Sequence, residues 1–184
     1  KLLNRLIEKN KINEKNKNDI LSKIKIVKGL KFLKDVDLII EAVIEDLEIK
    51  KELFSNVEAF VNYDCIIATN TSSLSITNLA SKLNYPNRFI GIHFFNPAPL
   101  MPLVEIIPAL QTSKYVSKEI YKLIQKWGKF PVIAKDTPGF IVNRVARPFY
   151  GEAIRIYEEG IADFAITEDS DLIAFGCPKI LAKI

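Results

Sequence analysis

The chain has 184 residues, of which 48% are hydrophobic and 26% charged, and its formal net charge is +4. This composition is ordinary for a globular protein, and no apolar run reaches the roughly 18 residues that a membrane-spanning helix needs. The positive charge near the N-terminus is mixed with acids and amides, which favours a solvated helical face over a nucleic-acid-binding surface. The isolated cysteines Cys65 and Cys177 predict reduced thiols in a cytoplasmic protein.

Helical and strand patterns alternate along most of the chain. Two helical stretches come first, and the run KIKIV (23–27) predicts a short strand. Further apolar runs predict strands over 36–43, 65–70, 88–94, 104–108 and 130–134, and helical periodicity predicts helices over 46–61, 75–83 and 117–128, the last closed by Gly128. Apolar strands that alternate with helices predict a doubly wound α/β domain, with a mostly parallel sheet covered on both faces.

The pattern changes after a turn at residues 135–139. One long helical pattern covers 140–160, and Pro148 within it is expected to produce a kink. We therefore predict a domain over residues 1–136, the first helix of an all-α C-terminal domain over 137–162, and a divergent or fused tail over 163–184. Because the chain starts at Lys1 and not at Met, we expect it to be part of a longer product.

Polar segments follow three of the predicted strands, at residues 41–45, at the NTSS turn and at HFFNP. Parallel strand ends meet at one edge of a sheet, where doubly wound domains bind ligands. This edge should bring together a carboxylate, the Ser72 hydroxyl and the imidazole of His93, the only histidine. Glu105 begins the next apolar run, within reach of His93. A His–carboxylate pair fixes one tautomer and stabilises the imidazolium, so it can take a proton from an alcohol while hydride leaves the same carbon.

Other interpretations of these residues fit less well. A lone histidine after a strand is often structural, but its position at the sheet edge favours a chemical role for His93. Ser72 lies outside a G-x-S-x-G nucleophile elbow, which disfavours a hydrolase. One histidine and two scattered cysteines predict no metal site.

Four segments resemble the NAD-dependent 3-hydroxyacyl-CoA dehydrogenase family, in order and without large gaps over about residues 1–162. They are EAVIEDLEIKKELF, ATNTSSLSIT, RFIGIHFFNPAPLMPLVEII and KDTPGFIVNRVARPFYGEAIRIYEEG. The likeness is greatest to the bacterial 3-hydroxybutyryl-CoA and 3-hydroxyadipyl-CoA dehydrogenases. It implies a Rossmann-like fold, NAD as cofactor, an acyl-CoA substrate and a homodimer built by the helical domain. The implied reaction oxidises a (3S)-3-hydroxyacyl-CoA to a 3-oxoacyl-CoA, as in fatty acid β-oxidation.

The resemblance also implies roles for individual residues. His93 matches the family's catalytic base, Glu105 its carboxylate partner, and Asn143 the asparagine that fixes the substrate's 3-oxygen. Ser72 matches the residue that contacts both the substrate oxygen and the nicotinamide. The remaining implied cofactor contacts are Glu45 and Lys50 around the nicotinamide ribose, with Ala42 and Asn96 lining the same cleft.

The sequence departs from the family pattern in two places. It contains no G-x-G-x-x-G turn, so we expect the sheet to lack the first βαβ unit of a Rossmann fold. The tail ADFAITEDSDLIAFGCPKILAKI resembles a segment of the flap-endonuclease and exonuclease-type 5′ nucleases, in which Asp169 and Asp171, with Glu168 beside them, match metal-binding positions. Two alternatives to a dehydrogenase therefore stay open: a fragment of a metal-dependent 5′ nuclease, and a Rossmann-like remnant that binds no cofactor.

Overall fold

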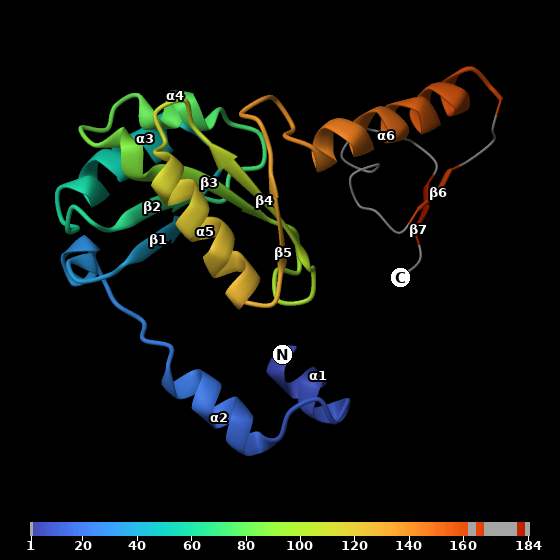
Figure 1. Cartoon of the computed structure of the whole chain (residues 1–184). Helices are drawn as coiled ribbons and strands as arrows, with labels where there is room; N and C mark the ends of the chain where they lie inside the picture. Colours follow the sequence, from blue (N-terminus) through green and yellow to red (C-terminus); the bar gives the residue numbers. More distant parts are fainter. Residues whose placement is uncertain (1, 162–164, 168–179, 183–184) are drawn as a thin grey trace.

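The computed structural model describes residues 2–161, 165–167 and 180–182. Helices α1 (Leu2–Glu8) and α2 (Glu14–Ser22) form an N-terminal arm that lies away from the sheet (Figure 1). No residue of either helix is buried. Asn13 caps α2 through a reciprocal capping box with Asn16, so local hydrogen bonds define the start of this helix.

The prediction of a strand over residues 23–27 is wrong. Lys23 caps the end of α2, the residues after it form no regular structure, and Ile24 and Ile26 are 63% and 90% exposed. A strand requires a neighbouring strand to accept and donate its backbone hydrogen bonds. The strand nearest to this segment in the sequence is β1, which forms one edge of the sheet. Among the described residues, β1 pairs only with β2.

The five-stranded sheet has the order β1-β2-β3-β4-β5. Its strands are β1 (Leu38–Glu41), β2 (Ile66–Thr69), β3 (Phe89–Phe94), β4 (Leu103–Pro108) and β5 (Phe130–Ile133). The connecting elements are the 3-10 turns η1 (Leu30–Leu33) and η2 (Pro86–Arg88) and the helices α3 (Leu47–Glu58), α4 (Ile76–Ala80) and α5 (Lys114–Lys126). The mostly parallel α/β fold predicted from the sequence is confirmed, because three of the four strand pairs are parallel.

Strands β3 and β4 form the one antiparallel pair of this sheet. A parallel connection needs a crossover of about a dozen residues or more, usually with a helix, and the loop between these strands is shorter. The reversal places the start of β4 beside the end of β3. His93 is therefore paired directly with Glu105 in the register of the two strands.

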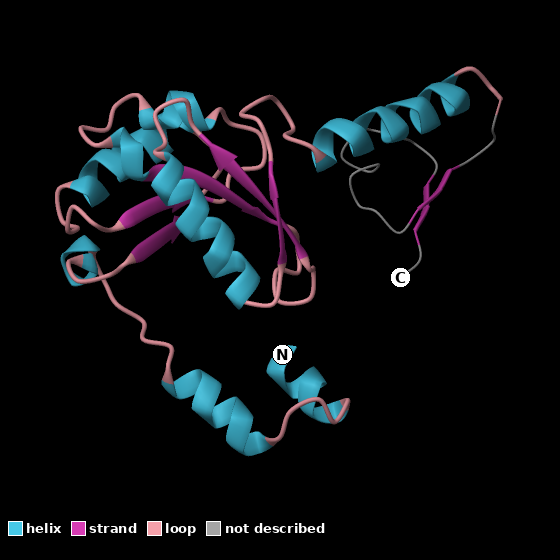
Figure 2. Cartoon of the chain, in the orientation of Figure 1, coloured by secondary structure: helices cyan, strands magenta, loops and turns pink. Residues whose placement is uncertain are grey.

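Helices cover both faces of the sheet (Figure 2). Successive residues of a strand point to opposite faces, so β2 and β3 send alternate side chains into two cores. Ile67 and Phe89 join the core under α3 and α4, whereas Ala68, Ile90 and Ile92 join the core under α5. This two-faced burial is the reason that most residues of the central strands are apolar.

The last helix of the described residues, α6 (Val142–Glu158), extends away from the sheet after the 135–139 turn (Figure 1). Pro148 lies inside it, and none of its residues is buried. Beyond it, the short strands β6 (Ala165–Thr167) and β7 (Ile180–Ala182) pair in parallel. Asp169, Asp171, Glu168 and Cys177 lie outside the described residues. Among the described helices, none has the length and apolar character needed to cross a membrane.

Candidate active site

The imidazole of His93 and the carboxylate of Glu105 form a buried pair. His93 is 5% exposed and Glu105 fully buried, and His93 Nδ1 lies 2.7 Å from Glu105 Oε2. With an ionised Glu105, the proton of the neutral imidazole is on Nδ1, and this N–H donates a hydrogen bond to the carboxylate. Nε2 is then the acceptor nitrogen. The antiparallel register produces this geometry, since it places the two residues opposite each other on one face.

The second oxygen of Glu105 holds the start of α6. Oε1 accepts hydrogen bonds from the backbone N–H groups of Ile141 and Val142, at 2.8 and 2.9 Å. Burial raises the pKa of Glu105, but the hydrogen bonds from His93 and from these two N–H groups outweigh burial, and the net pKa lies below its ordinary value. Glu105 is therefore an anion that hydrogen-bonds both the imidazole of His93 and the start of α6.

Two aromatic rings enclose the imidazole. The Phe95 and Phe140 ring centroids lie 4.6 and 5.6 Å from that of His93. Phe140 is 3% exposed and has a φ of 47°, in the left-handed region that an aromatic residue rarely adopts. Such backbone strain is held by the surrounding structure and is concentrated at functional sites.

The turn after β2 brings a hydroxyl and an amide to the same place. Asn70 Oδ1 accepts the Phe94 N–H at 2.8 Å, which ties the end of β2 to the end of β3. Two residues further along the turn, Ser72 is half-buried, and its carbonyl accepts a hydrogen bond from Asn143 Nδ2 at 3.3 Å. Asn143, from the first turn of α6, therefore faces Ser72 across the site.

A cavity of about 400 Å³ lies between these elements. Four of the predicted site residues line it: Ser72, His93, Asn96 and Asn143. Asn70 and Arg147 line it as well and were not among the predicted site residues. The signal for Arg147 is its spacing, because a residue four positions after Asn143 lies on the same face of a helix. Asn70 could have been found as the first residue of the NTSS turn.

Glu45 organises the turn that carries Ser72. Its Oε1 accepts the Thr71 hydroxyl and the N–H groups of Ser72 and Ser73, the last two at 3.0 and 3.3 Å. Burial raises the pKa of Glu45, but the Thr71 hydroxyl, the Ser72 N–H and the ammonium of Lys50 outweigh it, and the net pKa is lowered. The carboxylate is thus a fixed anion at the end of β1.

Lys50 lies beneath this anion and not on the cavity wall. Its side chain is 1% exposed, and its Nζ lies 2.6 Å from Glu41 Oε1 and 3.2 Å from Glu45 Oε2. Glu41 Oε2 in turn accepts the Thr69 hydroxyl at 2.7 Å. Every charge in this cluster is paired, as burial requires. Ala42, the remaining predicted contact, is exposed directly after β1.

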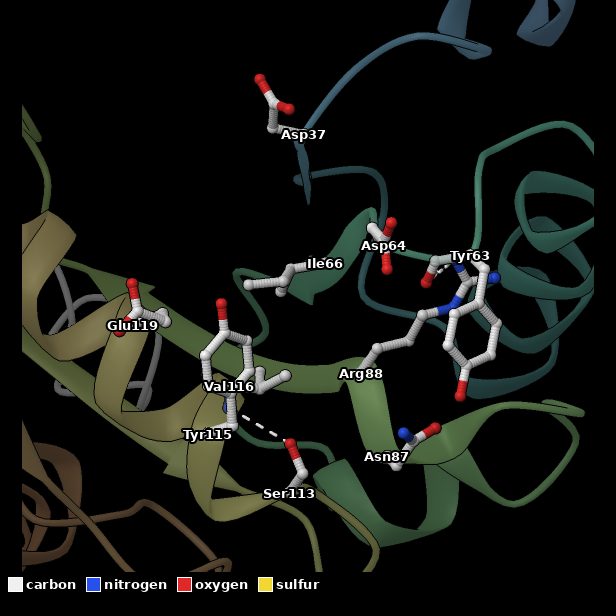
Figure 3. Close-up of a pocket in the computed structure, with 10 residues that line it drawn as sticks. All are labelled: Asp37, Tyr63, Asp64, Ile66, Asn87, Arg88, Ser113, Tyr115, Val116 and Glu119. Atoms are coloured by element: carbon white, nitrogen blue, oxygen red, sulfur yellow. Dashed lines mark hydrogen bonds between the residues drawn. The ribbon is translucent and has the colours of Figure 1, made fainter.

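A second cavity, of about 300 Å³, lies at the opposite end of the parallel strands (Figure 3). Asp37, Asp64 and Arg88, which precede β1, β2 and β3, line it together with Ser113 and Tyr115 of the α5 start. Arg88 donates to the carbonyls of Asn62, Tyr63 and Cys65, so its guanidinium holds loops together. None of the predicted site residues lies here.

Comparison with known proteins identifies the relatives of the chain. The family "3-hydroxyacyl-CoA dehydrogenase, NAD binding domain" matches residues 1–137, and the "XPG I-region" matches residues 151–184. A 3-hydroxybutyryl-CoA dehydrogenase of Clostridioides difficile is 48% identical over 70% of this chain and 46% of its own length. A 3-hydroxyadipyl-CoA dehydrogenase of Escherichia coli is 50% identical over 68% of this chain and 26% of its own length.

The fold agrees with the same relatives. The structure of (S)-3-hydroxybutyryl-CoA dehydrogenase PaaH1 from Ralstonia eutropha covers 87% of this chain and 56% of its own, with a TM-score of 0.84 and 42% identity. The chain thus spans about half or less of the length of these relatives. With the family matched over residues 1–137 and the fold shared, this chain belongs to the NAD-binding domain family of the 3-hydroxyacyl-CoA dehydrogenases.

Proposed function

We propose that the protein oxidises the 3-hydroxyl of a (3S)-3-hydroxyacyl-CoA to the ketone, with NAD as the oxidant, in fatty acid or related acyl-CoA oxidation. The observation that carries the proposal is the buried His93–Glu105 pair at the edge of a cavity shared with Ser72 and Asn143. Its chemistry is that of a base for an alcohol proton, and the named relatives act on 3-hydroxyacyl-CoA compounds.

Each residue of the site has a defined task in this reaction. His93 Nε2 takes the proton of the substrate hydroxyl, and Glu105 stabilises the resulting imidazolium through Nδ1. Ser72 and Asn143 hold the oxygen from two sides of the cavity. The rings of Phe95 and Phe140 exclude water from the imidazole, which strengthens these interactions.

The residues at the β1 edge fit one half of NAD. Bound NAD supplies the acceptor for the hydride that leaves the carbon. Glu45 offers a half-exposed carboxylate to ribose hydroxyls, with Ala42 beside it and Ser72 at the nicotinamide end. Lys50 is buried under Glu45 and supports this carboxylate from below, while its direct contact with the ribose stays a prediction. The sequence has no G-x-G-x-x-G turn to hold the pyrophosphate.

The reducing compartment expected from the sequence agrees with this role. Cys65 is a free, buried thiol. Burial raises its pKa, so the thiol stays protonated and reacts poorly as a nucleophile. We infer that the protein works in the cytoplasm, where thiols remain reduced.

The test is NADH formation from 3-hydroxybutyryl-CoA, followed by absorbance. His93→Ala should abolish it, and Arg155→Gln is the control, because within the described part of the chain Arg155 donates hydrogen bonds to Glu152 of α6 and to Glu159, the residue that follows α6. A second candidate, a metal-dependent 5′ nuclease, is favoured only by the match of residues 151–184 to the XPG I-region. Magnesium-dependent cleavage of flap DNA without NADH formation would support the nuclease. If both activities are absent and NAD causes no thermal shift, a remnant that binds no cofactor is the better interpretation.

A further inference from the structure

The side-chain amide of Asn70 presents hydrogen-bond donors to the candidate active site. Asn70 follows β2 directly and lines the cavity that contains His93 and Ser72. Its Oδ1 accepts the Phe94 N–H at 2.8 Å, and because an N–H group needs an acceptor, this contact fixes which way the amide points. Nδ2 is therefore the other end of the amide, and within the described part of the chain it donates no hydrogen bond.

Asn70 is held in place by bonds to the strands on both sides of β2. Its backbone N–H donates to the carbonyl of Glu41 in β1 at 2.8 Å, and its Oδ1 is bonded to Phe94 in β3. The next residue, Thr71, is buried and donates its hydroxyl to Glu45. The Nδ2 donors are thus positioned before a ligand binds, so little ordering entropy opposes their use.

The 3-oxygen of the substrate does not need these donors. In the proposed reaction the substrate hydroxyl gives its proton to His93 and accepts hydrogen bonds from Ser72 and Asn143. A hydroxyl group donates one hydrogen bond and accepts two, so these three residues already satisfy it. The Nδ2 group of Asn70 must then serve another acceptor in the cavity.

The strand order indicates which acceptor this is. Glu45, the carboxylate proposed to bind ribose hydroxyls, follows β1, and His93 lies at the end of β3. Strand β2 lies between them, so Asn70 separates the ribose side of the site from the reacting carbon. Neighbouring strands are about 4.8 Å apart, which leaves about 10 Å between the ends of β1 and β3. A nicotinamide ring attached to a ribose beside Glu45 must cross this gap over the end of β2 to reach the carbon held at His93.

The nicotinamide ring carries one acceptor suited to an amide N–H, the oxygen of its carboxamide. We propose, building on the proposed function, that Asn70 Nδ2 donates a hydrogen bond to this carboxamide oxygen. The bond fixes the rotation of the ring about its link to the ribose. It thereby determines which face of the ring is turned toward the substrate carbon beside His93.

The test is a binding experiment that does not require turnover. Isothermal titration compares NAD with 3-acetylpyridine adenine dinucleotide, in which a methyl ketone replaces the carboxamide. The analogue keeps the carbonyl oxygen and lacks the NH₂ group. Because a donor at position 70 needs only the oxygen, the unchanged protein should bind the two nucleotides within about threefold of each other.

Asn70→Asp changes the free donor into an acceptor and keeps the bond to Phe94. One carboxylate oxygen can accept the Phe94 N–H, and the other faces the cavity. NAD can rotate its carboxamide and offer the NH₂ group to this oxygen, whereas the ketone of the analogue has no donor. The variant should therefore bind NAD at least about tenfold more tightly than the analogue.

Two further variants separate this contact from a purely structural role of Asn70. Asn87→Asp makes the same change of charge at an exposed residue that lines the cavity at the opposite end of the strands (Figure 3), and it should leave the ratio of the two affinities unchanged. Asn70→Ala loses the Phe94 bond as well as the donor, so it should weaken both nucleotides without discriminating between them. Equal binding of the two nucleotides by Asn70→Asp, or a preference for NAD above about tenfold in the unchanged protein, would overturn the proposal.

The contact and the catalytic function can fail independently. A preference for NAD that appears in Asn70→Asp, without NADH formation from 3-hydroxybutyryl-CoA by the unchanged protein, supports the contact and refutes the dehydrogenase. NADH formation by the unchanged protein, together with an Asn70→Asp variant that does not discriminate, supports the dehydrogenase and refutes the contact. Absence of NAD binding by the unchanged protein refutes both.

Discussion

Replacing Glu105 by Gln tests the centre of the site with little change of shape. The carboxylate accepts three short hydrogen bonds in a fully buried position, from His93 Nδ1 and from the N–H groups of Ile141 and Val142. Hydrogen bonds to a charged group contribute about 1 kcal/mol more than neutral ones. Loss of the charge from three such bonds should therefore lower the free energy of unfolding by about 3 kcal/mol, measurable by urea denaturation.

The same change should reverse the tautomer of the histidine. The amide oxygen of Gln can accept the two N–H groups of α6, which turns its NH₂ group toward His93. Nδ1 must then accept, so the imidazole proton moves to Nε2, and the nitrogen that faces the cavity can no longer take a proton. His93 is the only histidine, so its ¹⁵N resonances are assigned without ambiguity. We expect the Nδ1 and Nε2 shifts to exchange in the variant.

The dependence on pH provides a further signature. The pKa of Glu105 is lowered in the folded protein, so the unfolded chain binds more protons and stability rises with pH in that window. The contribution is complete above the unfolded pKa of about 4.3 and is lost as the pH falls through the folded value. The stability difference between the unchanged protein and Glu105→Gln should therefore shrink in acid. Glu119→Gln, which alters an exposed pair with Lys122, is the control. An unchanged tautomer together with unchanged stability would refute the reasoning.

Three further substitutions test the supports of the site by urea denaturation. Lys50→Met leaves the buried carboxylate of Glu41 unpaired and should cost about 3–5 kcal/mol, against about 1 kcal/mol or less for Lys82→Met at an exposed pair. Asp136→Ala removes the acceptor for the first N–H groups of α4 and should cost about 1–2 kcal/mol; a loss below about 0.3 kcal/mol would contradict this role. Gly139→Ala should cost more than about 1 kcal/mol, because φ is 76° and a Cβ would lie 3.0 Å from a backbone nitrogen of α6; a neutral result would mean that the turn adapts.

The strands and helices whose side chains are buried on one or both faces could be predicted from the sequence. The strand over 88–94 and the helix over 117–128 appear as β3 and α5, because their apolar patterns report burial directly. Gly128 has a φ of 73° at the end of α5, as its place after the helical pattern indicated. The run at 23–27 is also rich in β-branched residues but lacks a partner strand, and a sequence pattern does not encode the presence of a neighbour.

The candidate site shows the same division. The position of His93 at the end of one strand and of Ser72 in the turn after another predicted that they share a cavity, and they do. The direct pairing with Glu105 depends on the antiparallel reversal of β4, which is a property of the sheet as a whole. Lys50 was expected at the cofactor surface, yet it is buried under Glu45, since its long side chain reaches two acids below the rim. The roles of these residues in binding and catalysis stay predictions.

Glu105 links His93 to the start of α6 through its two oxygens. If α6 moves away, Oε1 loses both N–H donors, and the carboxylate reorients toward its remaining partner. The charge that fixes the imidazole is then no longer held in place from the other side. The shielding of the Nδ1 proton should therefore change if α6 leaves this position. A single resonance, the Nδ1 proton of the one histidine, reports whether this helix is engaged in solution.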